Sequence, residues 1–185
     1  MSFNHDGLMD PDEALRTLDL LSAESGSDFH MMIENKGTKL GGESKRLFDG
    51  GMEMLDIGGY FYEADVLSTP GSSKGQVRAL PFLVVRDCDA ATASIASLMN
   101  SQESQLIVNV LVFKASGDTG PDMQPFLEIE LRGARIGKHA ILTGGRPKRP
   151  CEIILFQYRE IEIKSAPQLL SGLRGAVRAA KLTNK

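Results

Sequence analysis

The amino-acid sequence predicts a mainly β protein: a single β-barrel of two packed antiparallel sheets, with one inserted α-helix and a helical extension at each end. Three observations support this prediction. Short apolar and β-branched runs recur between residues 29 and 164, several with the two-residue alternation of half-buried strands. Turns rich in glycine, serine and proline separate these runs. At both ends of the chain, apolar residues instead recur at helical spacing.

The 185 residues suffice for one ordinary domain, and 42% hydrophobic with 24% charged residues is a globular composition. We expect an acidic N-terminal extension over residues 1–27, a barrel domain over 28–165 and a basic helical tail over 166–185. Residues 1–28 hold seven acids and one base, whereas residues 165–185 hold four bases and no acid. These ends either improve solubility or attract each other, within a chain or between subunits.

The first predicted helix covers residues 10–21. Asp10 can cap this helix, Pro11 suits its first position, and Glu13 completes a capping box with Asp10. One face is apolar through Leu15, Leu18 and Leu21. We therefore expect this helix to dock on another surface.

Three strands are expected next. The first covers residues 29–33 and the second residues 52–62, where the apolar alternation slips near residues 54–55 and indicates a bulge. A polar, flexible loop over 69–75 leads to the third strand, over 77–86.

The inserted helix is expected over residues 90–100, with Asp89 as its N-cap. Its apolar face consists of Ala91, Ile95, Leu98 and Met99. The run over 106–113 is nearly all apolar and β-branched, which predicts a central strand covered on both faces.

The remaining strands show clearer alternation. Residues 126–132 place Leu127, Ile129 and Leu131 on one face and charged residues on the other, so this strand should have one wet face. A further short strand is expected over 135–142. The last long strand, over 152–164, changes its apolar face between Tyr158 and Ile161, as strands do at barrel corners.

The tail over residues 166–185 predicts a helix. Pro167 can open it, and its apolar side consists of Leu169, Leu170, Leu173, Val177 and Ala180. Gly172 and Gly175 weaken it, so the helix should need a docking surface.

No arrangement of catalytic or metal-binding residues stands out. The three histidines, His5, His30 and His139, are far apart in the sequence and lack metal-ligand spacing. His30 is expected to be a half-buried structural residue. The sequence therefore predicts no catalytic, cofactor or metal site, and not an enzyme.

The two cysteines are too few for a disulfide framework, and two separate thiols are expected. The neighbouring carboxylates Asp87 and Asp89 disfavour a thiolate at Cys88, whereas basic neighbours would favour one at Cys151. Cys151 alone keeps the hypothesis of an enzyme open.

Two carboxylate pairs share strand faces: Glu128 with Glu130, and Glu160 with Glu162. The spacing suits acid–base chemistry, but it is also typical of a solvated β face, which we favour. Such a face could line a polar channel built by several subunits.

Several function classes are excluded. A net charge of −3 argues against a dedicated nucleic-acid binder. The longest uncharged apolar run, residues 104–113, is half the length of a membrane-spanning helix, so no membrane insertion is expected. Residues 1–6 have no basic region or apolar core, so no signal peptide is expected.

The order of these features matches one family. The order begins with a strand at residues 29–33, a Gly-Glu-Ser step at 42–44 and a second strand at 53–57. A polar loop at 69–75 follows, and then a strand at 80–87, a helix at 90–100, a strand at 106–113 and a closing strand at 152–163. In this order residues 28–165 resemble the haemolysin-coregulated (Hcp) proteins, which form the inner tube of type VI secretion systems. The chain departs from the family in having no tryptophan and in carrying both terminal extensions.

The resemblance implies a structural subunit rather than an enzyme. Barrels would form hexameric rings that stack into a tube and carry effectors. The stacking loop would consist of Thr69, Pro70, Gly71, Ser72, Ser73 and Lys74. Implied partners are further copies of the chain, a spike protein at the tube tip, the contractile sheath and secreted effectors in the lumen. The chain would reside in the bacterial cytoplasm before assembly and then leave through the type VI apparatus.

Two alternatives remain open at this point. One is a tail-tube-like protein of another contractile injection system with the same barrel. The other is a monomeric barrel that binds a small ligand, which would require a closed apolar pocket instead of a ring with a polar interior.

Overall fold

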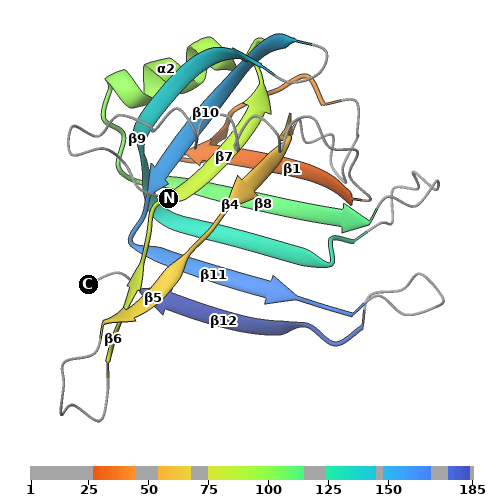
Figure 1. The fold of residues 1–185 in the computed structure, drawn as a ribbon, viewed down its shortest axis with the longest axis vertical. Helices are drawn as coiled ribbons and strands as arrows, with labels where there is room; N and C mark the ends of the chain where they lie inside the picture. Colours follow the sequence, from red (N-terminus) through yellow and green to blue (C-terminus); the bar gives the residue numbers. More distant parts are fainter. Residues whose placement is uncertain are drawn as a thin grey trace.

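The computed structural model describes residues 27–44, 54–67, 75–114, 124–144, 148–167 and 175–183. The helix expected over residues 10–21 and the expected stacking-loop residues 69–74 lie outside the described residues. The fold is mainly β with one inserted helix, as predicted (Figure 1). Its elements are β1 (Ser27–Asn35), β2 (Thr38–Lys39), β3 (Leu55–Asp56), β4 (Gly59–Phe61), β5 (Ala64–Leu67), β6 (Gln76–Ala79), β7 (Phe82–Asp87), α2 (Thr92–Asn100), β8 (Leu106–Lys114), β9 (Leu127–Gly144), β10 (Arg149–Gln157), β11 (Glu160–Ser165) and β12 (Arg178–Thr183).

Backbone hydrogen bonds connect the strands into a barrel. The order β1-β8-β9-β10-β7-β4 is antiparallel throughout, and β3 pairs with β1. Between β3 and β4, Ile57 N donates to Phe29 O at 3.1 Å, and Gly58 N donates to Val85 O at 2.8 Å. Residues 55–61 thus bond to β1 on one side and to β7 on the other, which returns the hydrogen-bonded circuit to its start.

The strand β9 belongs to both walls of the barrel. Its first half pairs with β8 and β11, and its second half pairs with β10. Gly133 lies at the bend with a φ of +57°, and a Cβ there would lie 3.0 Å from Arg159 Cδ. The two strands expected over 126–132 and 135–142 are therefore one strand, because a glycine turns the chain without ending the ladder.

Three other expected strands are interrupted. The segment 52–62 breaks at Ile57 and Gly58, because its two parts pair with different strands. Residues 52–53, which precede the bulge predicted near residues 54–55, lie outside the described residues. The strand expected over 77–86 divides at Leu80 and Pro81, since proline offers no N–H to a ladder. The strand expected over 152–164 divides between β10 and β11, at the place where its apolar face was predicted to change, between Tyr158 and Ile161.

The helix α2 begins at Thr92, and its N-cap position, Ala91, makes no side-chain capping bond. The predicted N-cap, Asp89, lies two residues earlier. Its Oδ1 accepts a hydrogen bond from Ala91 N at 2.8 Å, and its own N–H donates to Thr92 Oγ1 at 3.1 Å. Asp89 therefore forms an Asx turn before the helix instead of capping it.

The helix predicted for the C-terminal tail is wrong over residues 178–183, which form β12 and pair with β11. Strand β11 would otherwise leave a row of unpaired N–H and C=O groups at the sheet edge. Leu182 lies opposite Ile161 and extends the apolar face of the sheet. Tertiary pairing thus overrides a helical pattern that two glycines had weakened. Residues 168–174 lie outside the described ones.

The barrel interior is packed with apolar side chains from every wall and from α2. Ile95 of α2 is fully buried there. Strand β8 contributes alternate residues, Leu106, Val108 and Val110, whereas the residues between them are half-buried. The predicted central position of this strand is confirmed, because β8 lies between β1 and β9. Its outer face is covered only in part: Phe113 is 1% exposed, whereas Ile107 and Asn109 are half-buried.

Candidate functional site

The outer face of β8, β9, β11 and β12 is a charged surface, here called the polar wall. Alternation places Ile129, Leu131 and Ile161 in the core and their charged neighbours outside. Across the strands, Glu130 lies between Asn109 and Glu162. The wall consists of Asn109, Glu128, Glu130, Arg132, Glu160, Glu162, Lys164 and Lys181.

Charged side chains on the polar wall form ion pairs with their neighbours on the same face of the sheet. Lys164 Nζ lies 3.6 Å from Glu162 Oε2, and Lys181 Nζ lies 2.6 Å from Glu160 Oε1. Arg132 also pairs with Glu130, and this hydrogen bond raises the pKa of Arg132. Exposed pairs of this kind contribute little to stability, because water screens the attraction between the charges. The carboxylate pairs predicted from the sequence thus share a solvated face with cations between them, which suits contact with water better than acid–base chemistry.

A separate two-stranded hairpin, β5 with β6, projects past β11 and β12 (Figure 1). Its side chains Val66, Leu67 and Val77 are exposed despite being apolar. Arg78 pairs with Asp65 across the strands, and the guanidinium holds the pKa of that carboxyl below its usual range. Exposed apolar groups on a projecting hairpin indicate a contact surface. The expected stacking residues 69–74 connect these two strands in the sequence and lie outside the described residues.

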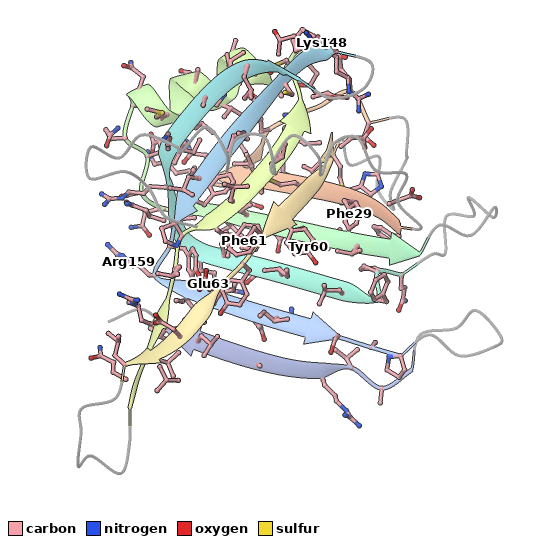
Figure 2. The ribbon with its side chains drawn as sticks, in the orientation of Figure 1. Phe29, Tyr60, Phe61, Glu63, Lys148 and Arg159 are labelled. Atoms are coloured by element: carbon pink, nitrogen blue, oxygen red, sulfur yellow. The ribbon has the colours of Figure 1, made fainter. Side chains whose placement is uncertain are left out.

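Aromatic packing anchors the base of this hairpin to the barrel. Tyr60 of β4 stacks on Phe82 of β7, with ring centroids 5.6 Å apart, and meets the edge of Phe29. Figure 2 shows Tyr60 and Phe61 on β4, with Glu63 where the hairpin begins. The Tyr158 hydroxyl donates a hydrogen bond to Leu80 O at 2.8 Å, which attaches the end of β6 to the barrel. The hairpin therefore projects from a rigid base.

The sequence analysis missed a buried ionic cluster that joins β7, β9 and β10. Glu152 is fully buried, and its Oε2 accepts a hydrogen bond from His139 Nε2 at 2.6 Å. Its Oε1 lies 3.4 Å from Nη1 of Arg86, which is 1% exposed and also pairs with Asp89. The strand alternation could have revealed this cluster. Arg86 and Glu152 are each two residues from a core residue, Val84 and Ile154, so their side chains point to the same inner face.

The cluster holds structure together more than it prepares chemistry. Two carboxylates, Glu152 and Asp89, lie beside the Arg86 guanidinium, and Asp89 ties the start of α2 to the sheet. Arg86 Nε and Nη1 and Glu152 Oε1 are buried without a hydrogen-bond partner among the described residues. Across the part of the chain that the structure describes, no three His, Cys, Asp or Glu side chains are arranged to hold a metal ion.

His30 is buried, and its Nδ1 lies 2.8 Å from Asp56 Oδ1, which joins β1 to β3. This hydrogen bond lowers the pKa of Asp56. The expected structural role of His30 agrees with this geometry, although the ring is more buried than expected.

The two cysteines are free thiols. Burial raises the pKa of Cys151 above its usual value, and the nearby Cys88 and Asp87 raise it further. Burial likewise raises the pKa of Cys88. The prediction that basic neighbours favour a Cys151 thiolate is therefore wrong, because removal of the thiol from water outweighs the effect of Arg149.

A groove of about 390 Å³ lies between the β1–β2 turn and α2. Apolar residues line it together with lysines: Ile33, Asn35, Lys36, Thr38, Lys39, Leu40 and Leu98. This groove is open, whereas the small-ligand alternative required a closed apolar pocket, and packed side chains fill the barrel interior. None of the described helices is long and apolar enough to span a membrane.

Solved structures share this fold. A structure described as a type six secretion system protein has 20% sequence identity and a TM-score of 0.65, covering 84% of this chain and 95% of its own. Hcp1 from Salmonella typhimurium has 10% identity and a TM-score of 0.61 over 84% and 95% of the two chains. Secreted protein Hcp3 from Pseudomonas aeruginosa has 15% identity and a TM-score of 0.59 over 86% and 99%.

Sequence comparison is more specific. No curated protein matches the chain significantly. The family model for "Type VI secretion system effector, Hcp" matches residues 59–164, which is more than half of the chain. This match runs from β4 to β11 and so includes the hairpin, the ionic cluster and the polar wall except for Lys181 of β12. The chain therefore belongs to the Hcp family of type VI secretion proteins.

Proposed function

We propose that this chain is the structural subunit of a type VI secretion inner tube, and that it acts without catalysis. Barrels associate side by side into hexameric rings, and rings stack into a tube that carries effectors. The observation that carries this proposal is the family match over residues 59–164. The filled barrel interior supports it, because it favours an assembling wall over a ligand-binding cavity.

The polar wall is the face that lines the lumen of the ring. Its four carboxylates and three cations interact with each other and with water, so this face has little to gain from burial against protein. A nearly neutral charged lining also lets different cargo proteins pass without strong attraction to either sign.

The hairpin β5–β6 makes the contact between rings. Val66, Leu67 and Val77 gain by burial against a neighbouring ring, since they are between 43% and 61% exposed in the single chain. The loop residues Thr69, Pro70, Gly71, Ser72, Ser73 and Lys74 belong to the same contact, as the family resemblance implies. A loop at the end of a rigidly anchored hairpin suits this role.

A subunit of such a tube has further partners. They are a spike protein at its tip, a contractile sheath around it and effectors inside it. The chain is in the bacterial cytoplasm before assembly and leaves through the apparatus. Loss of a sheath component should therefore abolish its appearance in the culture medium, while a cytoplasmic marker enzyme stays inside the cells.

Thiol labelling of assembled rings tests the lumen assignment. Both native cysteines are replaced by serine, and one new cysteine is introduced by Lys181→Cys on the polar wall or by Ile141→Cys, which is on another strand and 61% exposed. In stacked rings we expect Lys181→Cys to react with a small maleimide but not with a maleimide on a long polymer. Ile141→Cys should react with the small reagent in both states.

The unassembled protein is the control, because both positions should then accept both reagents. Equal reaction of Lys181→Cys with the polymer reagent before and after assembly would place the polar wall outside the tube and contradict the proposal.

A further inference from the structure

The hairpin β5–β6 has two chemically different faces. Its strands are joined by four cross-strand pairs: Ala64 with Ala79, Asp65 with Arg78, Val66 with Val77, and Leu67 with Gln76. Because side chains alternate along a strand, the first and third pairs share one face and the second and fourth share the other. The face of the first and third pairs is entirely apolar, and its two valines are 61% and 43% exposed. The opposite face holds the ion pair.

The ion pair has the geometry of a fork. Arg78 Nε donates to Asp65 Oδ1 at 3.0 Å, and Arg78 Nη2 donates to Asp65 Oδ2. Two parallel hydrogen bonds fix the relative orientation of the two side chains as well as their distance. The hydrogen bond to Asp65 raises the pKa of Arg78, and the nearby Glu63 adds a smaller effect in the same direction. The fork thus joins β5 to β6 one pair closer to the barrel than the exposed valines.

Few other contacts hold the two strands of the hairpin together. Next to the barrel, Leu80 N donates to Glu63 O at 3.0 Å. At the other end, a Cβ on Gly75 would clash with Val66 Cγ1, so the strands approach closely there. Among the described residues, the side chains of 64–67 and 76–78 take no part in the packed apolar interior of the barrel. A two-stranded ribbon without a packed second layer is marginally stable in water, so one cross-strand ion pair matters more here than in the barrel.

We propose that the Asp65–Arg78 ion pair positions the hairpin for the contact between rings, by holding β5 and β6 so that Val66 and Val77 form one preformed apolar surface on the opposite face. This inference rests on the proposed role of the hairpin between rings. A surface that is ordered before binding loses less conformational entropy when a neighbouring ring covers it. Asp65 and Arg78 are therefore positioning residues, which act through the valines and do not bind the neighbouring ring.

The symmetry of the ring enlarges the effect of a weak interaction. Loss of an exposed ion pair should weaken the contact of each hairpin only about twofold. A contact between two hexameric rings contains six hairpins, and a factor of two at six linked contacts multiplies to roughly 60-fold. The ion pair should therefore control stacking while leaving the unfolding of the barrel nearly unchanged.

Arg78→Gln tests the ion pair, with Lys36→Gln as the matched control. Lys36, on the β1–β2 turn, also forms an exposed ion pair, with Glu103 at 3.2 Å, so both variants lose one cation. Sedimentation velocity over a concentration series gives the concentration at which half of the rings are stacked. We expect this concentration to rise at least about tenfold for Arg78→Gln and to stay within about twofold of the parent for Lys36→Gln. Urea titrations of all three proteins should give the same midpoint.

The exchanged pair Asp65→Arg/Arg78→Asp separates positioning from direct binding. If the pair acts within the hairpin, the exchange restores the fork and returns stacking to within about threefold of the parent. If the two charges instead contact the neighbouring ring, the exchange inverts them at that surface and stacking stays lost, which would overturn the inference. Stacking of Arg78→Gln at the concentration of the control would overturn it as well.

Hydrogen exchange in the unstacked chain tests the same ordering without assembly. The backbone amides of residues 64–67 and 76–79 should exchange at least about twofold faster in Arg78→Gln than in the parent, and at the parent rate in the exchanged pair. Unchanged exchange in Arg78→Gln would contradict a positioning role even if stacking were lost. A parent that never stacks would contradict the proposed function, and the exchange rates would still decide whether the ion pair orders the hairpin.

Discussion

Arg86 and Glu152 are the residues whose burial is hardest to reconcile with an ordinary barrel core. The ion pair between Arg86 and Asp89 and the hydrogen bond between Glu152 and His139 offset part of the cost of taking these two charges out of water. The cluster joins three strands to the start of α2, so it fixes the end of the barrel that the helix covers.

Glu152→Gln should therefore lower the free energy of unfolding by about 1–3 kcal/mol, because it removes one of the two carboxylates beside the buried guanidinium of Arg86 and leaves only Asp89. The matched control, Glu162→Gln, removes a carboxylate from the polar wall and should cost less than about 1 kcal/mol. Urea denaturation measures both. A Glu152→Gln variant as stable as the control would show that the cluster contributes little.

Asp56 gives the second prediction at this scale. Its hydrogen bond with His30 lowers its pKa below the usual 3.8. A carboxyl with a lowered folded pKa stabilises the fold above its unfolded pKa, and this stabilisation is lost as pH falls through the folded pKa. The carboxyl is largely exposed, so the effect should stay below about 1 kcal/mol.

Asp56→Asn should thus be less stable than the parent at pH 6, and the difference should shrink as the pH falls below about 4. Unfolding free energies measured across this range check the sign. A difference that is constant with pH would contradict the electrostatic cause.

The hairpin β5–β6 makes a prediction at the scale of one element. Leu67→Ser/Val77→Ser should leave the hexameric ring intact and prevent rings from stacking, because it removes apolar surface only from the projecting hairpin. Ile141→Ser removes an apolar residue of β9 that is more exposed than either hairpin residue, and it should leave stacking unchanged. Sedimentation velocity distinguishes rings from stacks. Unaltered stacking by the hairpin variant would place the ring contact elsewhere.

Elements also show what the sequence could and could not predict. Strands with a strong alternation, such as β9, were identified because their pattern follows directly from which face is buried. The joining of two expected strands through Gly133, and the division at Ile57, depend on partner strands far away in the chain. The tail residues 178–183 have a helical pattern, yet the open edge of β11 makes them a strand.

The candidate site, too, could be predicted from the sequence only in part. The polar wall could be predicted, because the alternation of Glu128 and Glu130 with Ile129 is visible in the sequence alone. The ionic cluster could not, because its members come from three separate segments, at residues 86–89, 139 and 152. Each member alone has the same residue type as a surface charge.

The whole molecule is a barrel that presents chemically different surfaces on different sides. The polar wall meets water, the hairpin projects from an aromatic base, and a buried ionic cluster joins β7, β9 and β10. A subunit that presents different surfaces on different sides is suited to heterologous contacts, which close into a ring when the rotation between copies allows it.

The measurement that tests the proposed ring most directly is the solution mass of the full chain, by light scattering on a sizing column, with negative-stain images of the same peak. We expect a species with six times the 20.1 kDa mass of one chain and ring-shaped particles with an open centre. A particle of one or two chains at every protein concentration measured, with no rings in the images, would contradict the tube-subunit account.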